Sequence, residues 1–253
     1  MDNLLKEIAT KVKEAEKILF ITGAGMSADS GLPTYRGIGG LYDDNNTEDN
    51  IPIETAISGD MLRRKPEITW KYLLQISRSC KGASFNDGHR VLAEIEKSKP
   101  QTWILTQNID GFHRAAGSNN VIEIHGSLEK ISCMNCSYKG AADDLDVDMD
   151  NLPPYCNCGG VIRHDVVLFG EQLPEAEINK LYDVLQNGYD MVFSIGTTSV
   201  FPYIAQPVML AKQKGITSVE INPGETEVSS LADYRIKTGA SEALRKIWGY
   251  AQI

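Results

Sequence analysis

Short apolar runs alternate along the chain with stretches whose apolar residues recur at helical spacing. A continuous apolar run is typical of a strand buried on both faces of a sheet, and a period near 3.6 is typical of an amphipathic helix. Strands are expected at 18–22, 102–106, 121–124, 191–195, 217–221 and 235–237. Helices are expected at 3–17, after a cap at Asn86 or Asp87, and at 178–185, 205–214 and 241–247. The alternation predicts an α/β fold, with helices on both faces of a parallel sheet.

Two stretches interrupt this alternation. Residues 37–85 read as helical and loop-like, and residues 127–170 hold four cysteines and an acidic run at 143–150. We interpret the two stretches as parts of one smaller module, inserted into a larger domain made of residues 1–36, 86–126 and 171–253. A chain of 253 residues is long enough for this arrangement.

A glycine turn follows the first expected strand. The stretch from Gly23 to Ala28 has the spacing Gly-x-Gly-x-x-Gly/Ala, in which the second glycine lets free backbone N–H groups approach a pyrophosphate. The match is weak on its own, because a plain strand-to-loop turn can have the same spacing. A dehydrogenase would add a second strand that ends in an acidic residue about 20 positions on. Asp43 and Asp44 lie there with no strand before them, which disfavours that class.

Four of the five cysteines form two tight pairs, Cys133 with Cys136 and Cys156 with Cys158. Two such pairs suit a tetrahedral Zn²⁺ site, and a site saturated by four thiolates is structural rather than catalytic. The fifth cysteine, Cys80, is expected to be an ordinary core or surface thiol.

Polar side chains follow two further expected strands. Gln107, Asn108 and Asp110 come after one strand, and His125 comes after another. Ligands of open α/β sheets bind outside the carboxyl ends of the strands, and a histidine there can act as a general base near neutral pH. The remaining histidines are expected to be structural imidazoles: His89, His113 and His164.

The charge balance narrows the class of protein. A formal net charge of −9 argues against a nucleic-acid or anionic-membrane surface. No stretch is long and apolar enough to span a bilayer, and residues 1–4 lack the basic start of a signal peptide. A cytoplasmic protein with reduced cysteines is expected.

Together these motifs resemble the sirtuin (Sir2) family over nearly the whole chain. Residues 23–37 resemble the family's first signature, 106–113 its second, and 123–127 the segment that holds its catalytic histidine. The cysteine pairs fall where the family has its zinc module, and 166–171 resembles the strand that pairs with substrate peptide. Residues 195–199 and 220–222 resemble its later nucleotide-contacting turns. The resemblance implies a Rossmann-like doubly wound sheet with a smaller domain of zinc ribbon and helices.

The resemblance also implies an NAD-dependent protein-lysine deacylase. NAD⁺ would be consumed: the lysine amide oxygen attacks C1′ of the nicotinamide ribose, nicotinamide leaves, and His125 acts as general base through the ribose hydroxyls. Free lysine and O-acyl-ADP-ribose are the products. The implied partners are acylated-lysine proteins or peptides, with one structural Zn²⁺ and with no nucleic acid or membrane.

The resemblance assigns a role to each matching residue. The catalytic residues would be His125 and Asn108, and the zinc ligands would be Cys133, Cys136, Cys156 and Cys158. NAD would be bound by Gly23, Ala24, Gly25, Tyr35, Arg36, Gln107, Asn108, Asp110, Gly196, Thr197, Thr198, Asn222 and Ala240. Val167, Phe169 and Gly170 would offer backbone groups to a substrate peptide that adds as a strand.

Two positions bear on acyl preference. Family members that prefer succinyl or malonyl lysine carry Tyr-x-x-Arg in the helical module, where the arginine pairs with the acid group. The matching positions here hold Leu73 and Ile76, which favours apolar acyl groups, because an unpaired buried carboxylate is unfavourable. Two alternatives stay open: a protein mono-ADP-ribosyltransferase that uses the same NAD site, and a non-enzymatic NAD-sensing zinc module.

Overall fold

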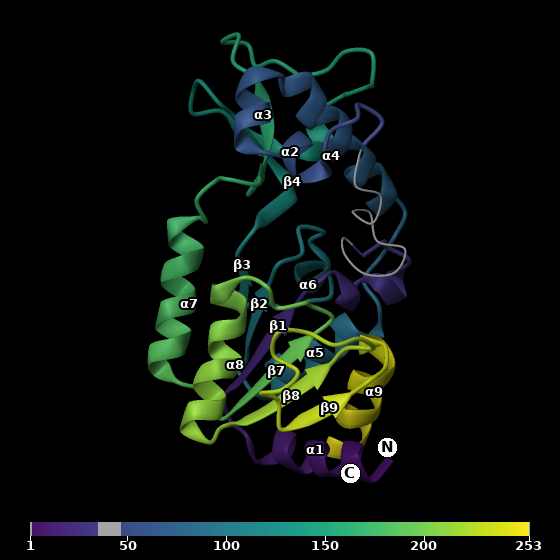
Figure 1. Ribbon diagram of the computed structural model, residues 1–253, viewed down its shortest axis with the longest axis vertical. Helices are drawn as coiled ribbons and strands as arrows, with labels where there is room; N and C mark the ends of the chain where they lie inside the picture. The colour runs from purple at the N-terminus through teal and green to yellow at the C-terminus, as the bar shows by residue number, and fades with distance from the viewer. Residues whose placement is uncertain (1, 35–46, 253) are drawn as a thin grey trace.

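A six-stranded parallel sheet forms the centre of the computed structural model, which describes residues 2–34 and 47–252. The strand order is β3-β2-β1-β7-β8-β9 (Figure 1). The strands are β1 (Ile18–Thr22), β2 (Trp103–Thr106), β3 (Val121–Glu123), β7 (Met191–Ile195), β8 (Thr217–Ile221) and β9 (Tyr234–Ile236). This is the Rossmann-like doubly wound order, in which the chain reverses direction across the sheet between β1 and β7. A ligand crevice is expected at the carboxyl ends of these two strands.

Helices cover both faces of the sheet (Figure 1). On one face lie α1 (Asp2–Glu14), α5 (Asp87–Ser98) and α9 (Ala240–Ala251). On the other lie α7 (Glu175–Asn187) and α8 (Pro202–Lys214). Successive strand residues alternate between the two layers: Phe20 packs in the first core, whereas Leu19 and Ile21 pack in the second. None of the helices described is long and apolar enough to cross a membrane.

The inserted stretches form a second unit above the sheet. An antiparallel sheet in the order β5-β4-β6 comprises β4 (Gly126–Cys133), β5 (Lys139–Ala141) and β6 (Ile162–Val166). Beside it lie α2 (Ile53–Ala56), α3 (Gly59–Arg64) and α4 (Pro66–Cys80). Trp70 of α4 is buried and donates from its indole nitrogen to the Ile162 carbonyl over 2.7 Å. One apolar cluster therefore joins the helices to the small sheet.

Candidate active site and metal centre

The glycine turn after β1 packs backbone against backbone on the turn after β7. A β-carbon on Gly25 would lie 2.7 Å from Cα of Gly196. One on Gly23 would lie 2.7 Å from Cβ of Thr197. The N–H groups of Gly23 and Gly25 donate to the carbonyls of Ile195 and Gly196, at 3.0 and 2.8 Å. These N–H groups are not the free donors that the motif led us to expect, and the two glycines serve the close packing of two turns.

The loop after β2 is bonded to the glycine turn. The buried amide of Asn108 donates to the Gly23 carbonyl over 3.0 Å and to the Ser27 hydroxyl over 3.2 Å. Ser27 in turn donates to the Asp110 carboxylate over 2.7 Å. Burial raises the pKa of Asp110, although hydrogen bonds from Phe112 and Ser27 act in the opposite direction. A continuous polar network therefore lines the carboxyl edge of β1 and β2.

His125 lies where the chain passes from β3 into β4. Its Nδ1 is 3.2 Å from the backbone carbonyl of Gln107. A carbonyl only accepts, so Nδ1 carries a proton and Nε2 holds the lone pair of the neutral ring. Burial lowers the pKa of His125, and the Gln107 carbonyl partly opposes this. The imidazole is therefore neutral near pH 7, which is the form that a general base requires.

A cleft lies between the loops after β1 and β2 and the helical part of the small unit. Ala24, Asn108 and Asp110 line it from the large domain, and Ile76 and Cys80 line it from α4. Cys80 thus faces the cleft, and burial raises the pKa of its thiol. The lining side chains carry no cation among the residues described.

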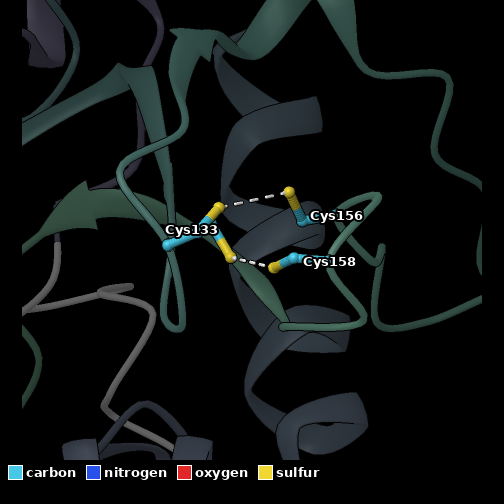
Figure 2. A group of neighbouring side chains, drawn as sticks. Cys133, Cys156 and Cys158 are labelled. Carbon is cyan, nitrogen blue, oxygen red and sulfur yellow. Dashed lines mark hydrogen bonds between the residues drawn. The ribbon is translucent and has the colours of Figure 1, made fainter.

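The four paired cysteines converge on one point of the small unit (Figure 2). Their Sγ atoms all lie within 4.8 Å of one another, with Cys133 3.5 Å from Cys158 and Cys136 3.7 Å from Cys156. A tetrahedron with metal–sulfur bonds of about 2.3 Å has edges of roughly 3.8 Å. A β-carbon on Gly160 would lie 2.7 Å from Sγ of Cys133, so only glycine allows this approach. The donor set and its spacing fit one structural Zn²⁺.

Residues 23–202 match the family model of the Sir2 family. The chain belongs to the Sir2 family. It is 48% identical over 243 residues to NAD-dependent protein deacylase 2 of Pseudomonas aeruginosa, which covers 95% of this chain and 94% of that relative. It is 34% identical over 234 residues to the NAD-dependent protein deacylase of Aquifex aeolicus, covering 92% and 94%. The family and the fold predicted from the sequence are both confirmed.

Solved Sir2 structures share this architecture. A complex of a Sir2 homologue with NAD superposes with a TM-score of 0.85 at 30% identity, covering 97% of this chain and 93% of that one. A complex of Sir2 with a p53 peptide and NAD⁺ gives a TM-score of 0.84 at 27% identity, covering 98% of each chain.

In this Sir2 family member the nucleotide-binding residues predicted from the second half of the chain gather at the carboxyl edge of the large sheet. Gln107 donates from its side-chain amide to the Thr197 hydroxyl over 2.7 Å. Asn222 follows β8 and donates to the Thr197 carbonyl over 3.1 Å. Thr198 is exposed, whereas Ala240 begins α9 and its methyl group is buried in the apolar core.

The predicted peptide-pairing segment follows β6, which ends at Val166. Val167 donates to the carbonyl of His125 over 2.9 Å. The N–H of Phe169 donates to the Ile57 carbonyl over 3.1 Å, and its carbonyl accepts from the N–H of Gly59, the first residue of α3, over 3.0 Å. Gly170 is exposed and has a positive φ of 80°. The backbone of Phe169 is therefore already engaged, and Gly170 presents the more accessible part of the segment.

Two of the predicted residues lie outside the described part of the chain, and two residues that bond the site were given no role in the prediction. Tyr35 and Arg36, which were predicted to close over the reacting end, lie outside the described residues. Ser27 bridges Asn108 and Asp110 but was assigned no role, although its place inside the glycine motif was an available signal. Tyr203 bonds His125 from 78 residues away, and no local pattern predicts that contact.

Proposed function

We propose that this chain is an NAD⁺-dependent protein-lysine deacylase, which transfers the acyl group of a modified lysine to ADP-ribose and releases nicotinamide. The named relatives and the Sir2 family membership support this assignment. The observation that carries it is His125, a neutral imidazole with its basic nitrogen at the ligand-binding edge of the sheet. A module that only sensed NAD⁺ would have no need of a base there.

We assign the chemistry to side chains of the cleft and of the neighbouring loops that follow β2 and β3. Bound NAD⁺ supplies the electrophilic ribose carbon and the leaving nicotinamide. Gln107 and Asn108 hold the ribose, Asp110 holds the nicotinamide amide, and Nε2 of His125 accepts a proton from a ribose hydroxyl. The large domain and α4 both line the cleft, and a substrate bound there would limit access of competing water. The phosphate and adenosine end is assigned to Gly23, Ala24, Gly25, Gly196, Thr197, Thr198, Asn222 and Ala240.

The substrate is proposed to be a protein or peptide with an apolar acyl group on lysine. Its backbone would add beside Val167 and Gly170. Leu73 and Ile76 are both buried in the core of the small unit, but Ile76 also lines the cleft, so Ile76 is the position that bears on acyl choice. With no cation among the described lining residues, a succinyl carboxylate would be left unpaired beside Asp110.

The remaining assignments follow from the sequence and are proposals. The division into a large domain and a small domain has the ranges given above, and the shared apolar cluster of the inserted stretches supports it. The net charge of −9 makes nucleic acid and anionic membranes unsuitable partners. A cytoplasmic location stays a prediction.

The test is incubation with NAD⁺ and an acetyl-lysine peptide, with products followed by mass spectrometry. Nicotinamide together with deacylated peptide and O-acetyl-ADP-ribose supports the proposal. ADP-ribosylated protein favours the mono-ADP-ribosyltransferase, and unchanged NAD⁺ favours the sensor. A succinyl-lysine peptide run in parallel should react at least tenfold more slowly.

His125→Ala is the matched variant for this assay. The variant should still bind NAD⁺, as measured by calorimetry. Its rate of deacylation should fall by a factor of about 100 or more, the size expected for loss of general-base catalysis. A folded His125→Ala protein with full activity would remove His125 from the mechanism.

A further inference from the structure

Tyr203 covers the nitrogen of His125 that the reaction requires. The tyrosine lies in the first turn of α8, and its hydroxyl oxygen is 2.7 Å from Nε2. Because Nδ1 donates to the Gln107 carbonyl, the neutral ring accepts at Nε2 and the tyrosine hydroxyl is the donor. Burial raises the pKa of Tyr203 to about 12, so the hydroxyl keeps its proton at neutral pH.

Ring contacts place this hydroxyl beside His125. The rings of Phe201 and Tyr203 are stacked, with centroids 5.5 Å apart and planes 11° apart. The His125 ring stands edge-on to both, at centroid distances of 5.7 and 6.0 Å. Pro202 begins α8 between the two aromatic residues, and its fixed φ limits the freedom of that turn.

The same short segment carries residues that we assign to the nucleotide. The hydroxyl oxygen of Thr197 accepts two hydrogen bonds, one from the side-chain amide of Gln107 and one from the N–H of Ser199. Four residues after Ser199 the chain reaches Tyr203. A ligand that binds at Thr197 therefore acts on a loop that also positions the hydroxyl at His125.

We propose that Tyr203 is a positioning residue that occupies Nε2 of His125 in the nucleotide-free enzyme and yields that place to a ribose hydroxyl when NAD⁺ binds. This rests on the proposed function, because it takes His125 as the base. The imidazole nitrogen has one lone pair in its ring plane, so it accepts one strong hydrogen bond at a time. A ribose hydroxyl that gives its proton to Nε2 must displace the tyrosine hydroxyl first. Only a hydrogen bond is exchanged, and no covalent bond changes.

The exchange has two measurable consequences. In the free enzyme the tyrosine hydroxyl occupies Nε2 and competes with NAD⁺ for it. Loss of the hydroxyl removes this competitor, so NAD⁺ affinity should rise about two- to tenfold, the range that one net hydrogen bond spans. The ring stays anchored through Nδ1 and the Gln107 carbonyl, so kcat should stay within about twofold.

The variant is Tyr203→Phe, with Tyr189→Phe as its matched control. The hydroxyl of Tyr189 donates to the carbonyl of Pro207 in α8, the helix that also holds Tyr203. It makes no bond to His125. Calorimetric Kd for NAD⁺, together with KM and kcat, should show tighter binding and lower KM in Tyr203→Phe alone. Unchanged or weaker NAD⁺ binding in Tyr203→Phe overturns the proposal. So does a tenfold fall in kcat at constant KM, because that result makes the tyrosine a proton relay.

A second readout needs no turnover. The chain has four histidines, so the ¹⁵N resonance of Nε2 of His125 can be assigned by substitution. Tyr203→Phe should shift this resonance in the free protein, and NAD⁺ should shift it in the wild type. An Nε2 resonance that does not differ between the two free proteins overturns the inference. A wild-type protein that binds NAD⁺ but deacylates nothing would instead count against the proposed function.

Discussion

The backbone carbonyl of Gln107 accepts a hydrogen bond from Nδ1 of His125 over 3.2 Å. Gln107 follows β2 and His125 follows β3, and these two strands are paired in parallel with Thr106 opposite Glu123. The main chain of one strand therefore sets the tautomer of the imidazole that follows its neighbour. A side-chain substitution at position 107 leaves this bond in place.

The first prediction concerns the pH dependence of activity. A general base works only in its neutral form, and burial lowers the pKa of His125 below its ordinary 6.5. The value of kcat/KM for NAD⁺ should therefore rise with pH through a midpoint below 6.5 and then reach a plateau at higher pH. Gln107→Ala keeps the carbonyl but loses the bond to Thr197, so its midpoint should match the wild type while KM rises. A midpoint above 6.5 in the wild type contradicts a buried neutral base.

Most strands of the large sheet could be predicted because they are short runs rich in apolar and β-branched residues. β1, β7 and β8 begin and end at the predicted residues. The helix expected at 3–17 ends at Glu14 instead. The N–H groups of Glu16 and Lys17 donate to the Asp190 carboxylate, each over 2.9 Å, which draws them out of the helical pattern. A partner more than 170 residues away leaves no local signal.

The site could be predicted by residue type but not by bonding. The sequence places Asn108 and Asp110 after a strand, yet only the fold shows that Ser27 bonds both. The motif also suggested that the glycine N–H groups are free, and this was wrong for Gly23 and Gly25, because the carbonyls of Ile195 and Gly196 accept from them. Residues distant in sequence supply these partners, so periodicity and spacing carry no information about them.

Gly25→Ala should destabilise the protein and weaken NAD⁺ binding. The added β-carbon would lie 2.7 Å from Cα of Gly196, and neither backbone can move without disturbing the ends of β1 and β7. A loss of about 1–3 kcal/mol in the free energy of unfolding is expected, measured by urea denaturation.

Gly249→Ala provides the matched control for this substitution. Gly249 is exposed within α9 with no neighbour within 4 Å of an added β-carbon. Alanine there should raise the free energy of unfolding by about 0.5–1 kcal/mol, because it has the higher helix propensity. Equal stability of Gly25→Ala and wild type would mean that the two turns do not pack closely.

Zinc should be needed for a folded small domain. Plasma mass spectrometry should find one zinc per chain in the wild type and in Cys80→Ser, and far less in Cys156→Ser. Because zinc binding contributes directly to folding free energy, Cys156→Ser and chelated wild type should both lose activity. Trp70 is 1% exposed and bonded to β6, so its fluorescence should shift to longer wavelength as the domain opens. A metal-free protein with full activity would exclude a structural role for the metal.

Acid should destabilise the fold through two buried histidines. The rings of His89 and His113 lie 4.8 Å apart, and both are buried, as their structural interpretation requires. Burial lowers the pKa of His89 to about 4 and that of His113 well below 6.5. From pH 6.5 downward the unfolded chain binds protons at these positions and the folded chain does not. The free energy of unfolding must therefore fall as the pH falls. For His89 alone the loss approaches about 3 kcal/mol by pH 4.

His89→Gln tests this acid sensitivity while preserving the helix cap. Nδ1 of His89 accepts from the Asn86 N–H over 3.3 Å, and a glutamine at this third helical position can make the same capping-box bond. Urea denaturation at pH 7 and pH 5 should show a smaller loss of stability in His89→Gln than in the wild type. Parallel stability–pH curves for the two proteins would mean that His89 takes up its proton in the folded state as readily as in the unfolded chain.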